Sequence, residues 1–139
     1  MSALKAALIL CLFSVSFTIQ GRAVKVIAAG TKTVAACGFA VKPTAELVSH
    51  LAYPPDWKVV VVCNENLWDS LMRQSKVQFI SDYAFTFRPN RVTFIRGKVF
   101  QVTMQYTPEQ VLRHELGHIL CRCDDEDRAW ALAAKTSAK

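Results

Sequence analysis

Two histidines and a glutamate lie close together near the end of the chain, in the run HELGH. His114 and His118 are four residues apart, so on a helix their imidazoles project from one face about one turn apart. Two imidazoles in this arrangement can bind one Zn²⁺ at about 2.0–2.1 Å each. Glu115 would lie beside the metal, where its carboxylate can take a proton from a zinc-bound water and pass it to a leaving amine. The run therefore predicts a catalytic zinc site.

The residues just before this run carry the signals of a helix start. Thr107 can cap the helix, Pro108 suits its first position, and Gln110 completes a capping box. Glu109 places a negative charge in the first turn, where it interacts favourably with the helix dipole. The helix can therefore present metal ligands on one side and bury its other side against a sheet. The apolar positions of that buried side are Leu112, Leu116 and Ile119.

The HELGH run, placed after predicted strands and before an acidic helix start, resembles the zincin metallopeptidases. The resemblance covers Asn64–Ala134 as an order of elements, and only HELGH and the acidic stretch are specific. In the gluzincins, the zincins with a glutamate as third ligand, that glutamate lies on a following helix, often as E-x-x-A. Glu126 to Ala129 match this pattern, so the resemblance implies Glu126 as the third Zn²⁺ ligand. It also implies a zinc metalloendopeptidase whose substrate is a peptide or protein.

Asp124 competes with Glu126 for the third ligand position. The related metzincin motif places its third ligand six residues after the second histidine, which is Asp124 in this chain. The glycine of that motif is replaced by Cys121, so we favour Glu126 and leave Asp124 open. The acidic run 124–127 can also serve only to cap the last helix.

Other polar residues are weaker candidates. Zincins often stabilise the oxyanion with a Tyr, His or Arg, and Tyr106, Arg113 and Arg122 all lie near the predicted site. No feature of the sequence selects one of them, and His50 is expected to be structural or exposed. The resemblance also implies that a strand forms the rim of the cleft and pairs with the extended substrate. A catalytically idle zincin-fold binding module of the cell envelope is the alternative function, favoured by the small size of the chain.

Length and composition restrict the remaining possibilities. The chain has 139 residues, 52% of them hydrophobic, with five Gly and five Pro. This composition excludes a disordered or low-complexity chain and is enough for one domain with a real core. No apolar run reaches the roughly 18 residues of a membrane helix, so a multi-span protein is excluded. The formal net charge is +6, but no basic run or aromatic motif predicts nucleic-acid binding.

The first 23 residues have the layout of a secretory signal peptide. Lys5 supplies a positive start, residues 6–19 carry no charge, and small residues precede a cleavage point after Ala23. Cleavage would leave residues 24–139 as a single domain in a secreted or periplasmic protein, whereas an uncleaved segment would act as an anchor. We expect no other contact with a membrane.

Export affects how the cysteines are interpreted. Cys37, Cys63, Cys121 and Cys123 follow the predicted signal and are expected to form disulfides, for which three connectivities exist. The turn after the HELGH helix contains no Gly or Pro. We therefore expect Cys121 or Cys123 to pair with Cys63 and so tie this turn to the end of a central strand.

The remaining pattern predicts an α+β fold of zincin type. Residues 44–52 form a short helix, 58–63 a buried strand, and Asn64 caps a helix whose apolar stripe follows. Strands at 83–88, 92–95 and 99–102 form an antiparallel meander. This small antiparallel or mixed sheet packs on the HELGH helix, and a C-terminal helix completes the domain. The apolar stripe of the second helix comprises Leu67, Trp68, Leu71 and Met72.

Overall fold

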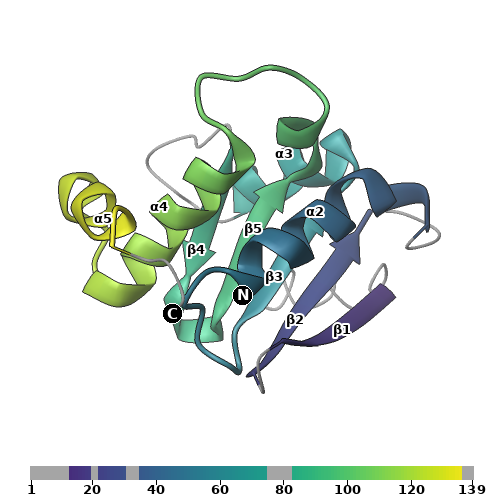
Figure 1. Cartoon of the computed structure of the whole chain (residues 1–139). Coiled ribbons are helices and arrows are strands. Elements are labelled where there is room, and N and C mark those ends of the chain that lie inside the picture. Colours follow the sequence, from purple (N-terminus) through teal and green to yellow (C-terminus); the bar gives the residue numbers. More distant parts are fainter. Residues whose placement is uncertain (1–12, 20–21, 31–34, 75–82, 136–139) are drawn as a thin grey trace.

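A computed structural model describes residues 13–19, 22–30, 35–74 and 83–135 of the chain (Figure 1). The fold is α+β, as predicted, with strands and helices intermixed along the sequence. The elements are β1 Phe13–Ile19, β2 Arg22–Ala29, α2 Gly38–Ser49, β3 Lys58–Val62, α3 Glu65–Gln74, β4 Ala84–Phe87, β5 Val92–Arg96, α4 Pro108–Cys121 and α5 Glu126–Ala133. Three short 3-10 turns complete them: η1 Ala35–Cys37, η2 Arg88–Asn90 and η3 Gly97–Phe100.

The sheet is mixed, with the strand order β1-β2-β3-β5-β4. Its three inner strands, β2, β3 and β5, run parallel, and both edge strands pair antiparallel with their neighbours. Residues 59–62 of β3 are all valines and all buried. Such a continuous β-branched run is typical of an inner strand that is covered on both faces.

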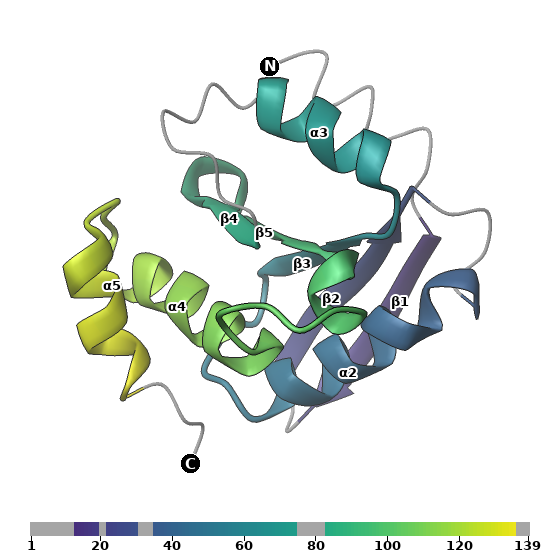
Figure 2. The same cartoon turned by 90° about the horizontal axis from the view of Figure 1, so that it is seen from above.

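Helices cover the two faces of the sheet, α3 on one and α2 with α4 on the other (Figure 2). Trp68 and Leu71 of α3 pack against Phe85 and Phe94 on the first face. On the second face, Leu112 and Leu116 of α4 are fully buried. The helix that carries the HELGH run is therefore fixed to the sheet by its apolar side.

Several of the predicted elements are confirmed. The strand from Lys58 becomes β3, and the Oδ1 atom of Asn64 accepts a hydrogen bond from the backbone N–H of Leu67 at 3.1 Å, as expected of a helix cap. The hairpin of β4 and β5 also forms, with Phe85 opposite Phe94. The local patterns of the sequence therefore give these elements correctly.

The predicted meander is wrong beyond its first hairpin. β5 pairs in parallel with β3, and the expected strand 99–102 is replaced by η3 and an irregular segment. Val99 is buried because it packs into the core that α2 and α4 cover, not because it lies in a strand. A Cβ at Gly97 would lie 3.0 Å from the carbonyl oxygen of Val62, so the chain passes close to the end of β3 here.

The helix predicted at 44–52 begins earlier than expected. α2 starts at Gly38 and continues through Pro43, because Ala40 and Val41 of its first turns are buried in the core. Pro43 therefore lies inside the helix, where it cannot donate a backbone hydrogen bond to the preceding turn.

The predicted signal segment overlaps the start of the sheet. β1 and the first two residues of β2 belong to it, and residues 1–12 and 20–21 lie outside the part that the structure describes. β1 pairs with β2 alone and forms one edge of the sheet. Signal removal stays a prediction. No helix among the described residues has the length and apolar character to cross a membrane.

Candidate metal centre

Helix α4 begins with the predicted cap. The Thr107 hydroxyl accepts a hydrogen bond from the backbone N–H of Gln110 at 3.2 Å, and the Gln110 side chain accepts one from the N–H of Thr107 at 2.9 Å. Pro108 occupies the first helical position. On the buried side, the Tyr53 hydroxyl donates to the carbonyl oxygen of Leu112 at 2.7 Å. These contacts fix both the start and the rotation of the helix.

The two histidines face each other across one turn of α4. Their Nε2 atoms lie 3.2 Å apart, and their ring planes are inclined at 78°. Candidate ligand atoms of His114, Glu115 and His118 all lie within 4.8 Å of one another. This group could hold a metal ion. Its two histidines are the ligands that the spacing predicts, whereas the sequence predicts Glu115 as the base beside the metal.

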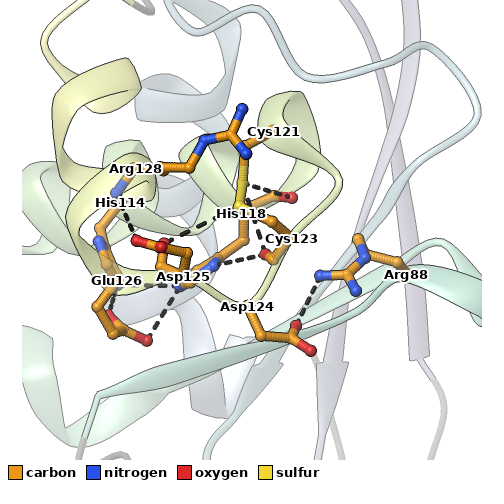
Figure 3. The surroundings of a disulfide bond; sticks show 9 residues. All are labelled: Arg88, His114, His118, Cys121, Cys123, Asp124, Asp125, Glu126 and Arg128. Atoms are coloured by element: carbon orange, nitrogen blue, oxygen red, sulfur yellow. Dashed lines mark hydrogen bonds and ion pairs between the residues drawn. A yellow bond between two sulfur atoms is a disulfide. The ribbon is translucent and has the colours of Figure 1, made fainter.

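Glu126 comes to the same point from the first turn of α5 (Figure 3). Its two carboxylate oxygens lie 2.7 Å from Nε2 of His114 and 3.3 Å from Nε2 of His118. Asp125 caps α5 by accepting a hydrogen bond from the N–H of Arg128 at 2.9 Å. The capping role expected of the acidic run therefore falls to Asp125, while the next residue reaches the histidines.

Asp124 is directed elsewhere. Its carboxylate lies 2.6 Å from the guanidinium of Arg88, and its side chain is 91% exposed (Figure 3). Of the two carboxylates that competed in the sequence, only Glu126 meets the imidazoles within hydrogen-bond distance.

Gly117, which sequence reasoning did not single out, allows α5 to approach. A Cβ at this position would overlap the carbonyl oxygen of Ala129 on α5. Both residues are buried in the contact between the two helices. The glycine inside HELGH is therefore needed for the close packing that brings Glu126 to the histidines.

A disulfide closes the turn between the two helices. Cys121 and Cys123 are bonded to each other, with their Cα atoms 5.2 Å apart. Arg122 between them ends α4 in the left-handed conformation, with φ 52°, which is uncommon for a residue with a side chain. The bond constrains a turn that contains no glycine to supply this conformation.

The predicted pairing of this turn with Cys63 is wrong. Cys63 is bonded to Cys37 instead, with a Cα separation of 6.0 Å. Cys63 follows the carboxyl end of β3, whereas α4 starts near that end of the sheet and runs away from it (Figure 1). The first disulfide therefore ties the start of α2 to β3, and the second stays within the turn.

Hydrogen bonds and burial determine the state of both imidazoles. Nδ1 of His118 lies 3.0 Å from the carbonyl oxygen of Cys123. A carbonyl can only accept, so Nδ1 of His118 carries a proton, and Nε2 is the ring nitrogen that faces His114 and Glu126. Burial lowers the pKa of His114, which the nearby Glu126 partly counteracts, so the neutral ring is favoured. Nδ1 of His114 is buried and has no hydrogen-bond partner within the described part of the chain.

Glu115 lies beneath this site and is 5% exposed. Burial raises its pKa to about 7, although a hydrogen bond from Thr86 opposes the shift. The Thr86 hydroxyl donates to one carboxylate oxygen, Oε2, at 2.7 Å. Thr86 lies on β4, and only the alternation of that strand could have indicated that it faces α4.

An aromatic row borders the site. The indole of Trp130 packs against the imidazole of His114, with ring centroids 4.2 Å apart, and Tyr106 packs against Trp130 at 5.0 Å. Among the oxyanion candidates, Tyr106 thus contacts the surroundings of the site. Arg113 forms an ion pair with Glu109 at 2.8 Å. The remaining candidate, Arg122, is exposed at the end of α4, and His50 is exposed at the end of α2.

No protein-family model matches the chain, and no curated protein matches it. The chemistry of the site therefore rests on its own geometry. Two imidazole nitrogens and a carboxylate are ligand types that Zn²⁺ takes in catalytic sites. The carbonyl that holds His118 is the kind of partner that commonly orients a histidine ligand. On both counts the residues present fit a zinc ion.

Proposed function

We propose that the chain is an exported, zinc-dependent metallopeptidase of zincin type that hydrolyses peptide bonds. His114, His118 and Glu126 would hold the ion, and Glu115 would act as the general base and acid. One observation carries the proposal: two imidazole Nε2 atoms and a carboxylate converge within 3.3 Å, with a buried glutamate adjoining them.

The buried glutamate is what distinguishes a catalytic site from a purely structural one. When bound, Zn²⁺ supplies a Lewis acid that polarises a substrate carbonyl and makes a coordinated water more acidic. Glu115 would accept the proton of the attacking water and deliver it to the amine nitrogen as the peptide bond breaks. A catalytic acid and base works best with a pKa near the working pH, and burial of Glu115 shifts its pKa in that direction in the metal-free chain.

Export is supported by the cysteines of the described segments. Cys37, Cys63, Cys121 and Cys123 form two disulfides, which persist mainly in oxidising compartments. A secreted or periplasmic protein, with a peptide or protein as its substrate, is consistent with this chemistry.

The test separates metal binding from hydrolysis. We expect one zinc per chain and chelator-sensitive cleavage of an unfolded protein substrate by the wild type. Glu115→Ala should keep the zinc and lose hydrolysis, whereas His114→Ala should lose both. Hydrolysis retained by Glu115→Ala would overturn the assignment. One zinc without turnover on any unfolded substrate would favour the alternative, a catalytically idle binding module of the cell envelope.

A further inference from the structure

A chain of hydrogen bonds runs from the core of the sheet to Glu115. The indole N–H of Trp57 donates to the hydroxyl of Thr93 at 3.0 Å. The hydroxyls of Thr93 and Thr86 lie 2.9 Å apart, and that of Thr86 donates to Oε2 of Glu115 at 2.7 Å. Thr86 and Thr93 are paired directly across β4 and β5, so the ladder itself sets their separation.

The donors and acceptors along this chain have one consistent direction. An indole N–H can only donate, so Thr93 accepts from Trp57 and keeps its own proton for Thr86. Thr86 has a single proton, which it gives to the carboxylate, so it must accept from Thr93. Each hydroxyl thus donates once and accepts once, and the ionised Glu115 is the final acceptor.

Burial makes this arrangement costly unless it is complete. Thr93 is 0% and Trp57 is 5% exposed, and the same face of the sheet is otherwise packed with apolar side chains. A buried hydroxyl without a partner costs about 1–3 kcal/mol, whereas valine has the same shape and no such requirement. Thr93 would therefore be destabilising in this core without a partner, and its hydrogen bonds lead through the half-buried Thr86 to Glu115.

We propose that Thr86, supported by Thr93 and Trp57, is a positioning residue that holds Glu115 by Oε2 and leaves Oε1 free for the reacting water and amine. The inference rests on the proposed function, because the orientation of Glu115 matters only if this carboxylate transfers protons. Thr86 acts through Glu115 and does not itself contact the substrate.

The first experiment compares threonine variants of the zinc-loaded protein. Thr86→Val should lower kcat by about 10- to 100-fold with an unchanged KM and one zinc per chain, because the base loses its fixed orientation. Thr86→Ser keeps the hydroxyl and should restore most of kcat. Thr44→Val is the matched control, since the Thr44 hydroxyl is buried without a hydrogen-bond partner in the described part of the chain, and it should leave kcat unchanged. A wild-type kcat in Thr86→Val would overturn the proposal.

The second experiment needs neither zinc nor activity. In the metal-free protein, the indole N–H signal of Trp57 in NMR spectra should shift in Thr86→Val and lose its protection from exchange in Thr93→Val. Thr44→Val should leave the signal in place. An inactive wild type would overturn the proposed function alone. An indole N–H signal that is unchanged in both Thr86→Val and Thr93→Val would overturn the proposed chain of hydrogen bonds.

Discussion

The carbonyl oxygen of Cys123 lies 3.0 Å from Nδ1 of His118. This contact joins the disulfide-closed turn to the second histidine of the site, because the carbonyl fixes both the proton position and the ring orientation of His118. The same turn leads directly to Glu126 (Figure 3). One short segment therefore controls two of the three groups that we assign to the metal.

Glu126 and Asp124 should differ sharply in their importance for zinc binding. We expect Glu126→Gln to weaken Zn²⁺ affinity by roughly two orders of magnitude, since it removes a negatively charged metal ligand that lies 2.7 Å from Nε2 of His114. Asp124→Asn is the matched control and should leave the affinity unchanged, because Asp124 pairs with Arg88. Competition with a chelator of known affinity measures both. A larger loss of Zn²⁺ affinity in Asp124→Asn than in Glu126→Gln would indicate that Asp124 is the third ligand.

Gly117→Ala should damage the site from a distance. The new methyl group would overlap the carbonyl oxygen of Ala129 and push α5 away, at a cost of about 1–3 kcal/mol in the free energy of unfolding. Zinc affinity should fall as well, because α5 carries Glu126. Gly38→Ala is the control: it has open space in the first turn of α2 and should be neutral or stabilising by about 0.5–1 kcal/mol. Urea unfolding measures both variants, and an equal change in the free energy of unfolding of Gly117→Ala and Gly38→Ala would contradict this packing.

The two disulfides should separate stability from metal binding. Cys37–Cys63 closes a loop with a sequence separation of 26, so its double serine variant should lose about 3–4 kcal/mol of stability. Cys121–Cys123 has a separation of 2, and its loss should cost only about 1.5–2 kcal/mol. Removing this second bond should nevertheless weaken zinc binding more, because the turn it closes holds His118. Thermal unfolding should show the larger loss of stability in the Cys37–Cys63 variant, and zinc titration should show the larger loss of affinity in the Cys121–Cys123 variant.

The buried Glu115 predicts how pH affects the metal-free protein. Burial raises its pKa from 4.5 to about 7, so between these values the folded chain binds more protons than the unfolded chain. Stability should therefore fall as pH rises through this window, relative to Glu115→Gln, which cannot titrate. The charges of His118 and Glu126 also affect the pKa of this carboxyl. The comparison is made with a chelator present, which keeps the protein free of metal. Urea unfolding at pH 4.5 and 7.5 measures this difference in stability, and Glu46→Gln, at an exposed position, is the control. The same change in stability with pH in the wild type and in Glu115→Gln would contradict the prediction.

The sequence predicts those parts of the fold whose signals are local. The capping box at Thr107 and the valine run of β3 depend on neighbouring residues alone, and both are confirmed. The pairing of β5 with β3 and the bond of Cys37 to Cys63 depend on how distant segments meet, and the sequence contains no signal for either. An apolar residue such as Val99 is compatible with a strand or with a single buried anchor, and only the packing decides.

The candidate site divides in the same way. The spacing of His114 and His118 follows from helix geometry, and the structure places their Nε2 atoms 3.2 Å apart. Thr86 and Gly117 could not be recognised, because their roles arise from contacts with Glu115 and with α5. Residues that position a site through tertiary contacts leave little trace in a single sequence.

The place of β1 has a consequence for the processed protein. β1 bonds to β2 alone, and cleavage after Ala23 would remove it completely. The outer backbone groups of β2 would then lose their partners, and the mature domain would carry an open border at residues 24–29. Maturation would thus leave an unpaired strand edge on the side of the sheet opposite to β4.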